Sequence, residues 1–185
     1  MNINMWKGDP RAEALAADEV IRLLNLQLHP GCTPQSGANE SYFAEVYRSN
    51  HPVGSETRST ASHIVYMMKD GAVSFFHHLD ADEMFHFHMG DPITIVELSK
   101  DVPGHTRKTI MGNDIRAGQS LFHVVKLGTW FGIIASADGR GGWSLFGISV
   151  TPAFQLSGSK SGVRRELMEE YPDARDTILK LTCDS

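Results

Sequence analysis

The sequence predicts a mainly β domain that forms a closed barrel or sandwich, with helical segments at both ends. Short stretches of strand-like period follow one another from Tyr42 to Val150, and turn residues separate them. Helical spacing and helix-forming composition are confined to the two ends of the chain. Many short strands at such spacing are typical of sandwiches and barrels.

The helical ends carry their own start and stop signals. Asp9 can cap a helix, and Pro10 suits the first helical position because its missing N–H would be unpaired there. We therefore expect a helical lead-in over about 9–28. A helical tail is expected over about 161–181, with a break at Pro172.

The barrel is expected over about 40–155, after a loop at 31–39 that is rich in Gly, Pro, Ser and Asn. Asp70-Gly71 predicts a tight hairpin turn. The expected strands are Ser41–Arg48, Ser62–Met68, Val73–His78, Glu83–His88, Ile93–Leu98, Thr106–Met111, Leu121–Lys126, Thr129–Ala135 and Trp143–Val150.

Length, charge and composition limit the classes of function. With 185 residues, residues 1–185 are expected to form a single domain. The net charge is −5 and no basic run is present, which disfavours nucleic acid and anionic membranes as partners. No apolar stretch approaches the ~20 residues of a membrane span, and the first residues do not resemble a secretory signal. With only two cysteines, Cys32 and Cys183, a cytoplasmic protein is expected.

Four residues between Gly71 and Gly90 stand at the spacing of a known motif. Five residues separate Gly71 from His77, five separate His77 from Glu83, and six separate Glu83 from Gly90. The first motif of the cupin superfamily has this spacing of glycine, histidine, glutamate and glycine. A Gly-Asp-Pro turn follows at Gly90.

The wider pattern resembles the cupin_5 family, a domain of unknown function. The resemblance covers roughly residues 20 to 172 and implies a cupin double-stranded β-helix, a jelly-roll barrel, that commonly forms a homodimer through its sheets. It supplies no known activity. Phe76 and Phe85 stand where family members often have tryptophan, and Glu40-Ser41 replaces a Gly-Gly pair. The matching segments are Ser62–Met68, Ser74–His77, Asp82–Phe87, Gly90–Pro92, Met111-Gly112 and Val150–Phe154.

The resemblance also implies where a metal would bind. Metal cupins use two histidines and the glutamate of the first motif, together with a histidine of the second. In this chain Leu79 and Phe131 occupy two of those positions, so only His77 and Glu83 are retained. Catalytic sites usually keep three protein ligands, and we therefore expect no tightly bound metal and no cofactor.

Three other histidines are expected on the outer face of the barrel. If Glu83 points inward, strand alternation places Phe85 and Phe87 inward and His86 and His88 outward. His78 would share that outer face if its strand is regular. The three could bind zinc adventitiously, but polar residues on a solvated or dimer-facing surface are the favoured interpretation.

His77 and Glu83 are expected to face one cavity. A neutral imidazole near a carboxylate can act as a general base, and some sugar-nucleotide epimerases of this barrel type use a histidine in this way without metal. The alternative is that His77 and Glu83 merely satisfy each other in a half-buried interior. His123 could reach the cavity, although a surface position is favoured. The residues expected to bind the ligand are Tyr66, Ser74, Phe85, Trp130, Phe131, His123 and Arg58.

Three hypotheses for the function remain open. The first is a metal-independent protein that binds a small polar metabolite and isomerises or epimerises a sugar-like compound, with His77 as base. The second is a metal-dependent oxygenase or isomerase with a degenerate site. The third is a non-catalytic binding or assembly domain.

Overall fold

The computed structural model describes residues 15–30, 40–55, 57–136 and 141–183. The predicted cap at Asp9-Pro10, the predicted loop at 31–39 and Cys32 lie outside the described residues. In the part that is described, no helix is long and apolar enough to cross a bilayer.

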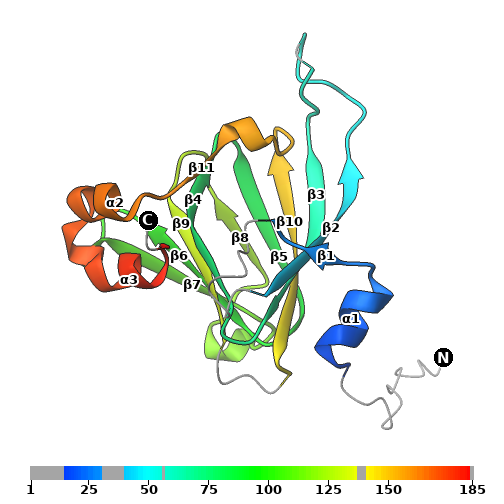
Figure 1. The fold of residues 1–185 in the computed structure, drawn as a ribbon, viewed down its shortest axis with the longest axis horizontal. Helices are drawn as coiled ribbons and strands as arrows, with labels where there is room; N and C mark the ends of the chain where they lie inside the picture. Colours follow the sequence, from blue (N-terminus) through cyan, green and yellow to red (C-terminus); the bar gives the residue numbers. More distant parts are fainter. Residues whose placement is uncertain (1–14, 31–39, 56, 137–140, 184–185) are drawn as a thin grey trace, which may run out of the picture.

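Two antiparallel sheets form a sandwich, as the sequence predicts (Figure 1). One sheet has the order β1-β2-β3-β10-β5-β8, and the other has the order β11-β4-β9-β6-β7. The strands of the first sheet are β1 (Gln27–Leu28), β2 (Ser41–Arg48), β3 (Ser62–Lys69), β5 (Asp82–Gly90), β8 (Phe122–Val125) and β10 (Trp143–Thr151). Those of the second are β4 (Val73–Leu79), β6 (Ile93–Leu98), β7 (Thr106–Met111), β9 (Phe131–Ala135) and β11 (Ser159–Ser161).

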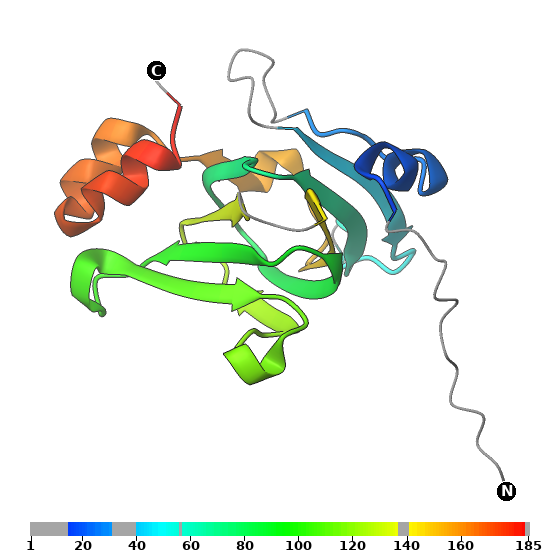
Figure 2. The ribbon, with the colours of Figure 1, turned by 90° about the horizontal axis from the view of Figure 1, so that it is seen from below.

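Helices flank the sandwich on both sides (Figures 1 and 2). The lead-in forms α1 (Ala17–Leu23), and the tail forms α2 (Arg164–Glu170) and α3 (Arg175–Lys180). A 3-10 turn at Pro172–Ala174 separates α2 from α3, which confirms the predicted break. Proline has no N–H to continue the ladder of the preceding helix.

The hairpin predicted at Asp70-Gly71 is wrong, although a tight turn is present there. The N–H of Ala72 bonds the carbonyl oxygen of Lys69 at 3.0 Å, but the flanking strands β3 and β4 belong to different sheets. Both edges of β3 are already paired, with β2 and β10. β4 therefore crosses to the opposite sheet, where its Leu79 joins the central apolar cluster.

Apolar residues fill three layers. The central cluster lies between the sheets and includes Phe85, Phe131 and Phe146. A second cluster, including Phe76, joins the outer face of the five-stranded sheet to the C-terminal helices. A third, around Trp143, joins the outer face of the six-stranded sheet to α1.

The last glycine of the motif is required by a close approach to β10. Gly90 has φ +90, and a Cβ atom placed on it would lie 2.3 Å from the carbonyl oxygen of Trp143. Gly71 also has positive φ, at +71, but a Cβ there would meet nothing within 4 Å. Only Gly90 therefore combines backbone strain with a steric clash.

We predict that Gly90→Ala lowers the free energy of unfolding by about 3 kcal/mol or more, because strain and overlap add. Gly71→Ala, the matched control, should cost only about 1–2 kcal/mol of backbone strain. Urea unfolding of both variants measures the difference. Equal losses would contradict the role assigned to the contact with Trp143.

Candidate functional site

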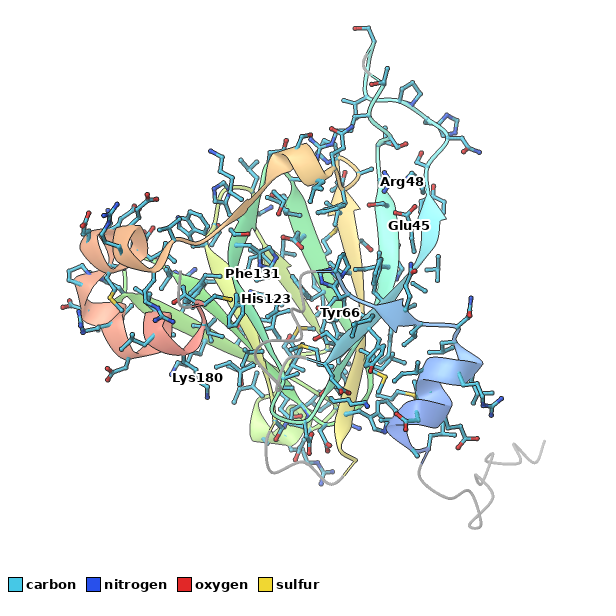
Figure 3. The ribbon with its side chains drawn as sticks, in the orientation of Figure 1. Glu45, Arg48, Tyr66, His123, Phe131 and Lys180 are labelled. Atoms are coloured by element: carbon cyan, nitrogen blue, oxygen red, sulfur yellow. The ribbon has the colours of Figure 1, made fainter. Side chains whose placement is uncertain are left out.

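A small set of polar side chains interrupts the apolar interior of the sandwich. Glu83 and Glu97 are buried, while His77 and His123 are partly buried. Tyr66 is buried at the centre of the six-stranded sheet. Figure 3 shows Tyr66, His123 and Phe131 in the region between the two sheets.

His77 is aimed inward by an irregularity in β4. Ser74 pairs with Ile133 of β9, but the register then shifts, and His77 pairs with Phe131. The Nδ1–H of His77 donates to the carbonyl oxygen of Phe75 at 2.8 Å, so the lone pair lies on Nε2. Burial lowers the pKa of His77, the bond to Phe75 opposes that effect, and nearby His78 adds to it. The imidazole is therefore neutral at pH 7.

Glu83 is a buried carboxyl group on the facing sheet. It is 5% exposed and lies between Val150 of β10 and Val125 of β8. Among the described residues no hydrogen-bond donor or cation contacts its carboxyl group. Burial raises the pKa of Glu83 to about 8, so the group is protonated at pH 7.

His77 and Glu83 flank the same pair of aromatic rings but do not bond each other. The next inward residue after Glu83 is Phe85, whose ring lies 5.7 Å from that of Phe131 between centroids. The ring of His77 is 4.4 Å from Phe131 on the same measure. The side chains of His77 and Glu83 thus lie on either side of the contact between Phe85 and Phe131. The alternative in which His77 and Glu83 bond each other is not what the structure shows, because His77 bonds Phe75 instead.

His29 is an interior residue that the sequence prediction missed. Its ring centroid lies 5.2 Å from Phe43 and 5.3 Å from Tyr66, both edge-on. Burial lowers the pKa of His29, and the proximity of His77 lowers it further. His29 directly follows β1, which is too short to show a period, although His29-Pro30 precedes the predicted loop.

His123 lies in the interior, and the favoured surface position is wrong. It pairs with Phe85, and its Nε2 lies 2.8 Å from Oε2 of Glu97 on the opposite sheet. The side chains are only 18% and 8% exposed. Glu97 was also missed, although the alternation Ile93, Ile95, Glu97 places it on the inward face of β6.

Two other predicted ligand-binding residues, Trp130 and Arg58, make structural contacts outside the interior. Trp130 packs with the outer cluster beneath the C-terminal helices, on the far side of the five-stranded sheet. Arg58 donates to both carboxylate oxygens of Asp80, at 3.1 and 2.9 Å, and to the carbonyl oxygen of Ala153 at 2.7 Å. An anionic ligand would therefore have to displace Asp80. Tyr66, Ser74, Phe85 and Phe131 keep positions facing or within the interior.

The three outward histidines do not gather into one group. His86 and His88 lie on the outer face of the six-stranded sheet, as expected. His78 belongs to β4 in the other sheet, and its ring lies 4.4 Å from that of Trp130. The change of sheet after β3 separates His78 from the other two, so the alternative in which all three bind one zinc ion does not fit the structure.

The residues at the implied metal position do not fit a metal. Leu79 and Phe131 are both buried in the central apolar cluster and offer no donor atom. Among the described residues, no group of three His, Cys, Asp or Glu side chains could hold an ion. The expectation of no tight metal stays a prediction.

We predict that Glu83 makes the fold less stable as pH rises. A carboxyl group with a raised folded-state pKa holds its proton more tightly when folded. The stability that this tighter proton binding adds to the free energy of unfolding is therefore fully present below the ordinary pKa of 4.5. It is lost as pH rises towards 8. Glu83→Gln keeps a neutral side chain, so the unfolding free energy of the variant minus that of the parent should increase between pH 5 and 8.5, by up to about 4 kcal/mol. Urea unfolding at several pH values tests this, and a constant difference would contradict it.

Comparisons with known proteins agree with this architecture. Residues 18–161 match the model of Cupin_5, described as Cupin superfamily (DUF985). Protein SO0799 from Shewanella oneidensis has a similar structure, with a TM-score of 0.78 and 29% identity over 92% of this chain and 99% of that one. A hypothetical protein from Leishmania major has a TM-score of 0.80 and 27% identity, over 92% and 100%.

More distant similarity concerns the fold alone. A mutant of Bacillus subtilis oxalate decarboxylase has a TM-score of 0.50 and 12% identity, over 86% of this chain and 38% of that one. No curated protein matches the chain. Because the family match spans most of the chain, from α1 to β11, the chain belongs to the Cupin_5 (DUF985) family of the cupin superfamily.

Proposed function

We propose that this protein binds a small polar metabolite between its sheets and transfers a proton on it without a metal, as an isomerase or epimerase does. The observation that supports the proposal is the protonation pattern of the interior. His77 is a neutral base with its lone pair on Nε2, and Glu83 is a neutral acid at pH 7.

His77 supplies the proton acceptor. The bond from Nδ1–H to Phe75 holds the ring in one tautomer and orientation. Nε2, the nitrogen that keeps the lone pair, is the atom that a ligand between the sheets would meet. A base whose pKa lies below neutrality is unprotonated and ready to accept a proton at pH 7.

Glu83 supplies the hydrogen-bond donor. A carboxylic acid kept neutral in apolar surroundings can stabilise the oxyanion that develops when a carbonyl compound loses its α-proton. In the proposed step the C–H bond beside a carbonyl breaks, and its proton moves to Nε2 of His77. The electron pair forms the carbon–carbon double bond of an enol, while the carbonyl oxygen takes the hydrogen bond and proton of Glu83. The imidazolium of His77 then returns a proton to carbon, and an enol hydroxyl returns its proton to Glu83, which restores both groups and gives the isomer or epimer.

The aromatic rings between these groups suit such a ligand. Phe85 and Phe131 separate the Glu83 level from the His77 level, and Tyr66 and His29 lie further along the interior. Apolar walls with a few polar groups are typical of small-molecule sites. The substrate class is therefore a hydroxy-carbonyl compound of sugar-like size.

The homodimer implied by the resemblance is kept as a proposal. The histidines and apolar residues on the outer face of the six-stranded sheet support it, since Phe122 is 46% and Met89 44% exposed. Small-angle scattering at micromolar concentration should give a particle of twice the chain mass. A monomeric mass would contradict pairing.

We predict that the protein exchanges the α-proton of one or more hydroxy-carbonyl compounds with solvent. The experiment incubates the protein with a panel of aldoses, ketoses and nucleotide-linked keto sugars in D2O and follows the α-proton by NMR. His77→Gln and Glu83→Gln should each slow exchange by about 10²–10⁴-fold, because a proton acceptor or donor is lost.

His78→Gln is the matched control, because His78 adjoins His77 on β4 but packs outward on Trp130. It should exchange like the parent. Equal loss in all three variants would point to a structural effect. Thermal shifts without exchange would favour a binding domain, and exchange that a chelator abolishes would favour a metal-dependent reaction.

A further inference from the structure

Three histidines lie together on the outer face of the six-stranded sheet, away from the proposed reaction site. His63 comes from β3, while His86 and His88 come from β5, on the other side of β10. His63 and His86 rings have centroids 6.1 Å apart. The neighbouring positions in the same rows of the sheet carry uncharged residues, namely Tyr47, Val65, Met84, Phe122, Val124, Gly147 and Ser149.

Gly147 brings two of these rings to one point. A Cβ atom on Gly147 would lie 2.7 Å from Nε2 of His63 and 2.9 Å from Nε2 of His88. The two rings reach Gly147 from opposite directions along β10. His63 pairs with Ser149, two residues after Gly147, whereas His88 lies at the register shift between Leu145 and Phe146, before it. The glycine leaves room over β10 that any other residue would fill.

Ser149 orients the His63 ring. Its Oγ lies 2.7 Å from Nδ1 of His63 and can accept the proton on that nitrogen, which leaves a lone pair on Nε2. Histidines that bind metals commonly hold their second nitrogen in such a hydrogen bond. The atom that His63 presents above Gly147 is then a donor atom for a metal.

We propose that His63 and His88 form a surface site for one divalent transition-metal ion, bound through both Nε2 atoms above Gly147. No third His, Cys, Asp or Glu of the described residues completes a cluster in this arrangement, so water fills the remaining positions. Imidazole nitrogen suits copper, nickel and zinc, and copper(II) binds most tightly in the general order of affinities.

The test titrates untagged, chelator-treated protein with Cu²⁺ and with Ni²⁺ and follows binding by calorimetry. One Cu²⁺ should bind per chain, more tightly than Ni²⁺, with electron-spin-resonance couplings from two imidazole nitrogens. His63→Gln and His88→Gln should each remove this site. His51→Gln is the control, because His51 is an exposed histidine elsewhere in the chain, and this variant should bind Cu²⁺ like the parent.

Two further variants keep both ligands and test the geometry. Gly147→Ala places a methyl group between the rings, and Ser149→Ala removes the orienting hydrogen bond. Each should weaken Cu²⁺ binding about tenfold or more. Folding of all variants is checked by thermal unfolding. Absence of Cu²⁺ binding by the folded parent would overturn the proposal. So would undiminished binding by a folded His63→Gln/His88→Gln double variant.

Discussion

The interior position of His77 depends on one break in strand pairing. In a regular strand Ser74 and His77 would face opposite sides, since side chains alternate. Their partners on β9, Ile133 and Phe131, are two residues apart and both face inward. The extra residue in β4 turns His77 inward and removes Phe76 from the ladder. The C-terminal tail then supplies hydrogen bonds to the backbone of Phe76. The N–H of Phe76 donates to the carbonyl oxygen of Leu181 at 2.8 Å, and the carbonyl oxygen of Phe76 accepts from the N–H of Gly162 at 2.7 Å.

Burial of Glu83 opposes stability, whereas Glu97, the other buried glutamate among the described residues, has a hydrogen-bond partner. Both Glu83 and Glu97 are buried between the sheets. Glu97 is bonded by His123, which ties the two sheets together across the sandwich. Glu83 has no such partner in the described part of the chain, and burying an unpaired carboxyl group costs free energy even when it is neutral. An uncompensated polar group in an otherwise consistent core is more typical of a functional position than of a structural one.

The sequence determined the local features well and the long-range ones poorly. The resemblance to the cupin motif singled out Gly71, His77, Glu83 and Gly90, and the period-two pattern located nine strands close to their observed bounds. It did not show that β3 and β4 join different sheets, because that choice depends on partners distant in sequence. The bonds of Arg58 to Asp80 and Ala153 are missed for the same reason. Strands as short as β1 and β11 hold too few residues to display a period.

The two proposed sites each hold a histidine through an oxygen atom at Nδ1. An oxygen that can only accept from Nδ1–H leaves the lone pair on Nε2, whereas an oxygen that can also donate does not fix it. In the interior the oxygen is the carbonyl of Phe75, a backbone group that cannot donate, so the tautomer of His77 is unambiguous. On the outer face it is the hydroxyl of Ser149, which can also donate, so the tautomer of His63 can change with what Nε2 meets. The first arrangement suits a base of fixed character, and the second suits a nitrogen that gains its lone pair when a metal ion arrives.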